Sequence, residues 1–79
     1  MSENKGNVIY SKPNCGGCVL VENWFKENGV EYTKIDVTQD QKAMEKVQNA
    51  GYMSLPLVEK DGDFVLNEFQ PEILGDLFL

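Results

Sequence analysis

The sequence predicts an α/β fold, a four-stranded mixed sheet flanked by three helices in the order β-α-β-α-β-β-α. Three observations predict this fold. A short strand-like run at residues 7–10 precedes a helical pattern and a second strand-like run, which implies a parallel pair with a right-handed crossover. An Asp61-Gly62 pair between two apolar runs adds an antiparallel hairpin. Pro71 suits the first turn of a last helix.

The first half of the chain supplies a strand, a helix and a strand. The strand NVIY at 7–10 is stopped by Lys12-Pro13, because proline restricts its own backbone conformation and that of the residue before it. Apolar residues then recur at helical spacing from 15 to 28, and Asn28-Gly29 is a typical helix stop. The alternating segment VEYTKIDV at 30–37 is predicted to be a strand whose register stays open.

The second half supplies a helix, the hairpin and the last helix. Thr38 begins a capping box, Thr38-x-x-Gln41, ahead of a helical pattern that Gly51 ends. The segments LPLVEK at 55–60 and DFVLNEF at 63–69 flank the Asp61-Gly62 pair, which favours a type I′ turn. The residues expected in the core are Trp24, Phe25, Ile35, Val47, Leu57 and Phe78.

Length and composition predict one small globular domain over residues 1–79, with 42% hydrophobic and 25% charged residues. The N-terminal stretch MSENKGN is polar and lacks the apolar region of a signal peptide. The sequence also lacks an apolar run near the ~20 residues that a membrane-spanning helix requires. We therefore expect a cytoplasmic protein, in a compartment where thiols are kept reduced.

The net charge of −6 falls entirely in residues 31–79, where four lysines face ten carboxylates. Residues 1–30 balance three lysines against three glutamates. An acidic surface argues against nucleic acid and anionic membranes as partners. It serves either as a solvated surface that aids solubility or as a means of steering towards a basic protein partner.

The two cysteines, Cys15 and Cys18, are separated by two glycines. A structural zinc site needs four ligands, and this chain offers two cysteines and no histidine. A zinc ion or an iron–sulfur cluster shared between two chains remains an alternative, as a carrier rather than an enzyme. A purely structural disulfide would close a very small loop and would constrain little of the unfolded chain.

Redox chemistry is the hypothesis that this spacing favours. Cys15 lies between a strand end and a helix start, where unpaired N–H groups and the helix dipole stabilise a thiolate, the nucleophilic form. Cys18 lies one helical turn later on the same face, within reach of a disulfide formed at Cys15. Gly16 and Gly17 leave the approach to Cys15 open. Lys12 either adds positive charge nearby or is a solvated loop lysine.

The stretch VIYSKPNCGGC, the later SLP, a hairpin and a final helix resemble the glutaredoxin branch of the thioredoxin fold. Within that branch the chain is most similar to NrdH-type redoxins, the small electron donors of class Ib ribonucleotide reductase. The likeness runs from about Val8 to Leu77. It implies a thioredoxin-like fold, with Cys15 as the attacking nucleophile and Cys18 as the resolving cysteine.

The resemblance also implies a substrate groove beside the cysteines. Pro56 matches the family's cis-proline, and Leu55 would offer its backbone N–H and C=O to a substrate strand. Tyr10 and Tyr52 are candidates to line this groove. Within the redoxins' later signatures, the matching residues are Gly51, Tyr52, Pro56, Phe69 and Pro71. The departures are Leu66, Asn67, Glu68 and Gln70, where that signature has Trp, Ser, Gly and Arg.

The departures bear on the reductant. Asn67 and Glu68 occupy the region where glutaredoxins bind the γ-glutamyl carboxylate of glutathione, and Glu68 would repel that carboxylate. Lys12 and Gln41 remain candidates for weak contacts with glutathione. We therefore expect a monomeric dithiol–disulfide oxidoreductase that serves ribonucleotide reductase or another disulfide protein and is re-reduced by thioredoxin reductase. A glutathione-dependent glutaredoxin is the alternative, and neither reading needs a tightly bound cofactor.

Overall fold

The computed structural model describes residues 6–79. Its elements follow the predicted order: β1 (Asn7–Ser11), α1 (Gly16–Glu27), β2 (Thr33–Asp36), α2 (Gln41–Asn49), β3 (Leu57–Lys60), β4 (Asp63–Leu66) and α3 (Pro71–Phe78). The predicted fold class is confirmed. The expected single domain over 1–79 stays a prediction, because residues 1–5 lie outside the described residues, as does most of the polar N-terminal stretch.

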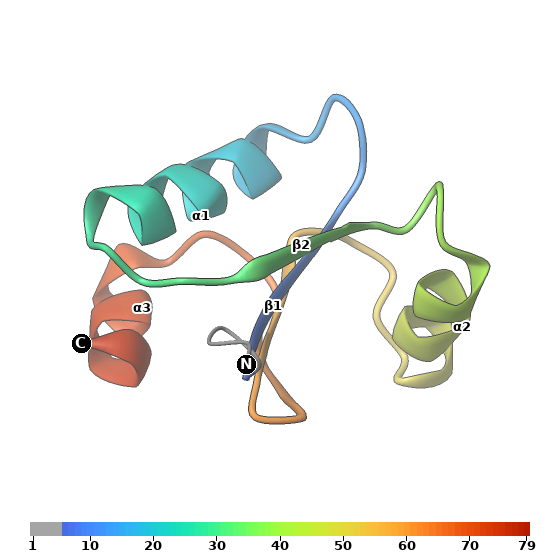
Figure 1. Ribbon diagram of the computed structural model, residues 1–79. Coiled ribbons are helices and arrows are strands. Elements are labelled where there is room, and N and C mark those ends of the chain that lie inside the picture. Colours follow the sequence, from blue (N-terminus) through green and yellow to red (C-terminus); the bar gives the residue numbers. More distant parts are fainter. Residues whose placement is uncertain (1–5) are drawn as a thin grey trace.

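The four strands form one mixed sheet in the order β2-β1-β3-β4. The crossover through α1 makes β1 and β2 parallel, as predicted, and the β1–β3 and β3–β4 pairs are antiparallel. Helices α1 and α3 lie together on one face of the sheet, and α2 lies on the other (Figure 1). A short loop joins the end of β1, an interior strand, to the start of α1, so the cysteines lie at the C-terminal end of β1.

Each face of the sheet has its own apolar core, because successive residues of a strand point to opposite faces. On β1, Ile9 packs with α1 and α3, whereas Tyr10 packs with α2. The first cluster comprises Ile9, Val21, Phe25, Val58, Leu66 and Leu74, and the second comprises Tyr10, Val37, Ala43, Val47 and Leu57. Of the residues expected in the core, three are buried; Trp24, Ile35 and Phe78 are partly buried and pack against these clusters.

The predicted capping box at Thr38 is wrong, because α2 begins two residues later than it implies. Asp40 is the N-cap, and its carboxylate accepts a hydrogen bond from the Ala43 N–H at 3.0 Å. Thr38 is instead tied back to Asp36, whose Oδ1 accepts from the Thr38 N–H at 2.9 Å and hydroxyl at 2.6 Å. The Thr38 hydroxyl and N–H together hold the pKa of the Asp36 carboxyl below its usual range.

Strands β2, β3 and β4 are shorter than the sequence predicts, and β1 is one residue longer, but the hairpin has the expected turn. Asp61 and Gly62 have φ values of 53° and 92°, as a type I′ turn requires at both central positions. Leu55 and Pro56 precede β3 instead of belonging to it. Within the described residues, none of the helices is both long enough and apolar enough to cross a membrane.

A polar network of buried Tyr10, buried Glu59 and half-exposed Lys46 ties β1, β3 and α2 together. The Tyr10 hydroxyl donates to Glu59 Oε1 at 2.6 Å, and the Lys46 ammonium lies 3.0 Å from the same oxygen. Burial and the hydrogen bond to Glu59 raise the pKa of Tyr10, and the hydrogen bond to Glu59 raises the pKa of Lys46.

We expect the free energy of unfolding to fall as the pH rises above about 10. A group whose pKa is higher in the folded state contributes stability that is complete below its unfolded pKa and is lost as the pH rises through its folded pKa. The loss should begin near the ordinary pKa values, 10.0 for Tyr10 and 10.5 for Lys46. Urea unfolding at about pH 9 and about pH 11 measures it. Tyr10→Phe should weaken the pH dependence, and equal wild-type stability at both pH values would contradict the expectation.

Candidate active site

Cys15 occupies the N-cap of α1, directly after the loop that leaves β1. Its backbone is extended, with φ −107° and ψ 103°, and its sulfur accepts a hydrogen bond from the Cys18 N–H at 3.2 Å. The first turn of α1 carries no acidic residue within the described chain. The partial positive charge of the helix N-terminus therefore acts on the Cys15 sulfur without a carboxylate in that turn to oppose it.

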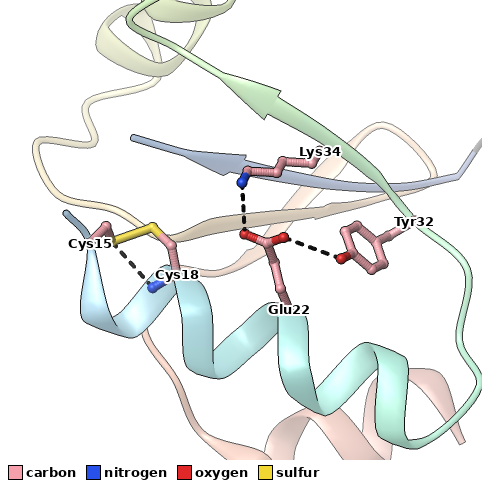
Figure 2. Close-up of polar contacts among 5 residues, drawn as sticks. All are labelled: Cys15, Cys18, Glu22, Tyr32 and Lys34. Carbon is pink, nitrogen blue, oxygen red and sulfur yellow. Dashed lines mark hydrogen bonds and ion pairs between the residues drawn. A yellow bond between two sulfur atoms is a disulfide. The ribbon is translucent and has the colours of Figure 1, made fainter. Parts of the chain in front are cut away.

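Cys15 and Cys18 form a disulfide in the structure, with their Cα atoms 5.2 Å apart (Figure 2). The residues differ in exposure, because Cys18 turns towards the sheet on the inner face of α1. Cys15 is 9% exposed and Cys18 is 2% exposed. Cys15 is therefore the more accessible residue of the pair.

The segment before β3 packs against the cysteine pair. The Leu55–Pro56 peptide bond is cis, and the Leu55 carbonyl oxygen lies 3.7 Å from the Cys15 sulfur. Gly17 allows this close approach, because a Cβ atom at that position would lie 3.1 Å from Pro56 Cδ. A thiol at Cys15 would be able to donate a hydrogen bond to the Leu55 carbonyl, whereas a disulfide sulfur carries no hydrogen to donate.

Two surface pockets flank the disulfide. We call the first the apolar pocket; it lies between α2 and the segment before β3 and is lined by Lys12, Val37, Thr38, Met44, Val47, Gln48, Tyr52, Met53, Ser54 and Leu55. We call the second the disulfide pocket; it is lined by Lys12, Pro13, Asn14, Cys15, Gly16, Cys18, Val19, Glu22 and Lys34. Lys12 is exposed and borders both pockets, including the one that Cys15 and Cys18 line.

The structure separates the other predicted site residues. Tyr52 and Leu55 line the apolar pocket, but Tyr10 is only 3% exposed and donates to Glu59 instead of facing the groove. Its position on β1 explains this, since its side chain points into the core beneath α2. Asn67 and Glu68 are exposed after β4 and line neither pocket beside the disulfide. Gln41 lies on α2 beside a separate shallow pocket.

Sequence reasoning did not identify a polar cluster beneath the disulfide. Glu22 is 9% exposed on α1, and its Oε2 atom lies 3.4 Å from the ammonium of Lys34 on β2. Its Oε1 atom accepts a hydrogen bond from the Tyr32 hydroxyl at 3.2 Å (Figure 2). Burial, assisted by the charge of Glu22, raises the pKa of Tyr32. One sequence signal could have pointed to Glu22: it follows Cys18 by four residues and therefore shares its helix face.

Residues 6–79 contain no group of three or more histidine, cysteine, aspartate or glutamate side chains placed to hold a metal ion.

Comparisons with known proteins agree with this geometry. The glutaredoxin family model matches residues 7–65, which include both cysteines. The glutaredoxin-like protein NrdH of Lactococcus lactis subsp. cremoris is 33% identical over 70 residues, which cover 89% of this chain and 96% of the relative. The N-acetyl-S-hydroxy-L-cysteine reductase of Bacillus subtilis is 33% identical over 60 residues, covering 75% of this chain and 64% of the relative.

Solved structures show the same likeness in three dimensions. The glutaredoxin-like protein NrdH-redoxin from Escherichia coli superposes with a TM-score of 0.83 at 25% identity, covering 92% of this chain and 95% of that one. The thioredoxin-like protein BC3987 superposes with a TM-score of 0.81 at 34% identity, covering 91% of this chain and 99% of that one. The arrangement of strands and helices is thus shared along nearly the whole described chain.

Proposed function

The chain belongs to the glutaredoxin family, and from that premise we propose that it passes electrons through Cys15 and Cys18 to the disulfide of a partner protein. Thiol–disulfide oxidoreduction is the chemistry of this family and of this chain. The observation that carries the assignment of roles is the difference between the two sulfurs. Cys15 lies outward at the helix N-terminus, and Cys18 is covered one turn behind it.

The reaction is two successive thiol–disulfide exchanges. The Cys15 thiolate attacks one sulfur of the partner's disulfide, forms a mixed disulfide and releases the other partner sulfur as a thiolate. Cys18 then loses its proton to water and attacks the Cys15 sulfur, which releases the second partner thiolate. Two electrons have moved from the dithiol to the partner, and the Cys15–Cys18 disulfide seen in the structure is the oxidised product.

The segment before β3 is suited to hold the partner chain during the exchange. Leu55 places its carbonyl beside the Cys15 sulfur, and Met53, two residues earlier, is 99% exposed. An extended partner segment would bond to the Leu55 backbone, and an apolar side chain next to its cysteine would enter the apolar pocket. Both contacts would place the partner's disulfide over Cys15.

Ribonucleotide reductase is the partner we propose, and thioredoxin reductase is the proposed source of electrons. The support is the likeness to NrdH proteins along nearly the whole chain. The solved structure of the Escherichia coli relative is described in terms of a thioredoxin-like activity profile, which favours a flavoprotein reductase over glutathione. The direct test is to reduce the oxidised chain with thioredoxin reductase and NADPH, and in parallel with glutathione and its reductase. Faster reduction by glutathione would overturn the choice of reductant.

Removing the charge of Glu68 should raise glutathione-dependent turnover about fivefold at low salt. Glu68 is exposed after β4, in the region where the family resemblance places glutathione's anionic group, and exposed charges contribute about 1 kcal/mol at most. Turnover of Glu68→Gln with glutathione is the measurement, and the gain should shrink as salt screens the charge. Glu31→Gln is the control, because Glu31 is also an exposed carboxylate and lies just before the start of β2. An unchanged rate would show that Glu68 does not face bound glutathione.

A further inference from the structure

Charged side chains from three elements meet around the disulfide. Among residues 6–79, the charged residues that line the disulfide pocket are Lys12 from the loop after β1, Glu22 from α1 and Lys34 from β2. Cys15 and Cys18 line the same pocket. A negative charge that forms on either sulfur is therefore created in the field of two cations and one carboxylate.

Glu22 is held in one place by partners on the neighbouring strand and the segment before it. Its two carboxylate oxygens are engaged separately, one by the Lys34 ammonium at 3.4 Å and one by the Tyr32 hydroxyl at 3.2 Å. Figure 2 shows Glu22 rising from α1 towards both partners, on the side of the helix that carries the disulfide. The Lys34 side chain is 53% exposed and lines the same pocket as the two cysteines.

We propose that the Glu22–Lys34 ion pair tunes the redox chemistry of the cysteine pair, with Lys34 stabilising the thiolate that reduction creates and Glu22 opposing it. The two residues act on the sulfurs through the field, so they are positioning residues and not nucleophiles. The proposal rests on the proposed function only in assigning the chemistry to Cys15 and Cys18. Because a stabilised thiolate stabilises the reduced form, the same field shifts the reduction potential of the pair.

We therefore expect substitutions of Lys34 and of Glu22 to change the thiolate fraction in opposite directions. Lys34→Gln removes a cation and should lower the fraction of thiolate below the thiol pKa by about threefold, as expected for a partly screened charge. Glu22→Gln removes an anion and should raise that fraction by about threefold. Both substitutions break the same ion pair, so a merely structural role would shift both in one direction.

The experiment measures the rate of iodoacetamide alkylation of the reduced full chain as a function of pH, which yields the pKa of the reactive thiol. We expect this pKa to rise in Lys34→Gln, to fall in Glu22→Gln and to return to the wild-type value in Lys34→Arg. Equilibration with dithiothreitol should show Lys34→Gln as the more readily oxidised and Glu22→Gln as the less readily oxidised protein. Glu59→Gln is the matched control, because it disrupts the Lys46–Glu59 pair on the opposite face of the sheet.

The proposal would be overturned if the thiol pKa shifted in the same direction in Lys34→Gln and Glu22→Gln, or stayed unchanged in both. Urea unfolding of each variant identifies any that is not folded. If Glu22→Gln does not fold, the comparison of Lys34→Gln with Lys34→Arg tests the proposal in its place. Failure here is distinct from failure of the proposed function. A wild-type chain that turns over disulfides while its variants show unchanged thiols refutes only the tuning role, whereas a wild-type chain without turnover refutes the function.

Discussion

Cys15→Ser should abolish disulfide reduction, because it removes the outward thiol while leaving the fold in place. A serine hydroxyl is a weak nucleophile near neutral pH, and the helix N-terminus cannot convert it into an oxyanion as it favours a thiolate. Turnover of an insulin disulfide or a small aromatic disulfide is the measurement, and it should fall to the uncatalysed rate. Urea unfolding of the reduced proteins should show that Cys15→Ser and the wild type are about equally stable.

Cys18→Ser should leave the first exchange intact and stop the second. Cys15 still attacks the partner, but the mixed disulfide then lacks an internal thiol that can resolve it. The expected result is a covalent complex that survives non-reducing electrophoresis and disappears with dithiothreitol. Leu20→Ala serves as a control for surface change, because Leu20 is 50% exposed on α1 and this variant keeps both cysteines. If Cys18 is the thiol alkylated first in the reduced wild type, the division of roles is wrong.

The order of elements could be predicted because its signals are local. An Asp-Gly pair, a proline at a helix start and a glycine after a helix each act within a few residues, and all three were found where expected. The predicted start of α2 was wrong because two local signals competed. Thr38 and Asp40 are both good caps, and the choice depended on the Asp36 carboxylate, which takes the Thr38 hydroxyl and N–H for itself.

In the candidate site, too, some features could be predicted from the sequence and others could not. The place of Cys15 at the start of α1 follows from a strand followed by a helix, and Pro56 beside the cysteines came from the family resemblance. The Glu22 cluster could not be predicted, because its partners are 10 and 12 residues away and the register of β2 was open. Tyr10 was assigned to the groove because sequence alone did not show which face of β1 it occupies; the structure pairs it with Glu59, 49 residues later.

Phe25→Ala should destabilise the protein by about 3–5 kcal/mol, the largest loss of stability that we expect from a single side chain here. Phe25 is fully buried on α1, and its ring lies 5.5 Å from that of Trp24, 5.3 Å from that of Tyr32 and 4.8 Å from that of Phe78. Truncation would leave a cavity where α1, α3 and the segment before β2 meet. A chain of this size has a free energy of unfolding of only about 4–12 kcal/mol, so Phe25→Ala would remove a large part of it.

Thermal unfolding provides the measurement, and the midpoint should fall by roughly 12 °C or more, at 4–8 °C for each kcal/mol. Leu20→Ala is the control on the same helix, because Leu20 is 50% exposed and its loss should change stability by no more than about 0.5 kcal/mol. Phe25 lies seven residues beyond Cys18, about 10 Å along the helix axis, so the folded fraction should keep wild-type alkylation kinetics. A loss below about 1 kcal/mol would show that α1 is held by its other contacts. A change in thiol reactivity at a temperature where the variant is folded would show that packing at the far end of α1 reaches the cysteines.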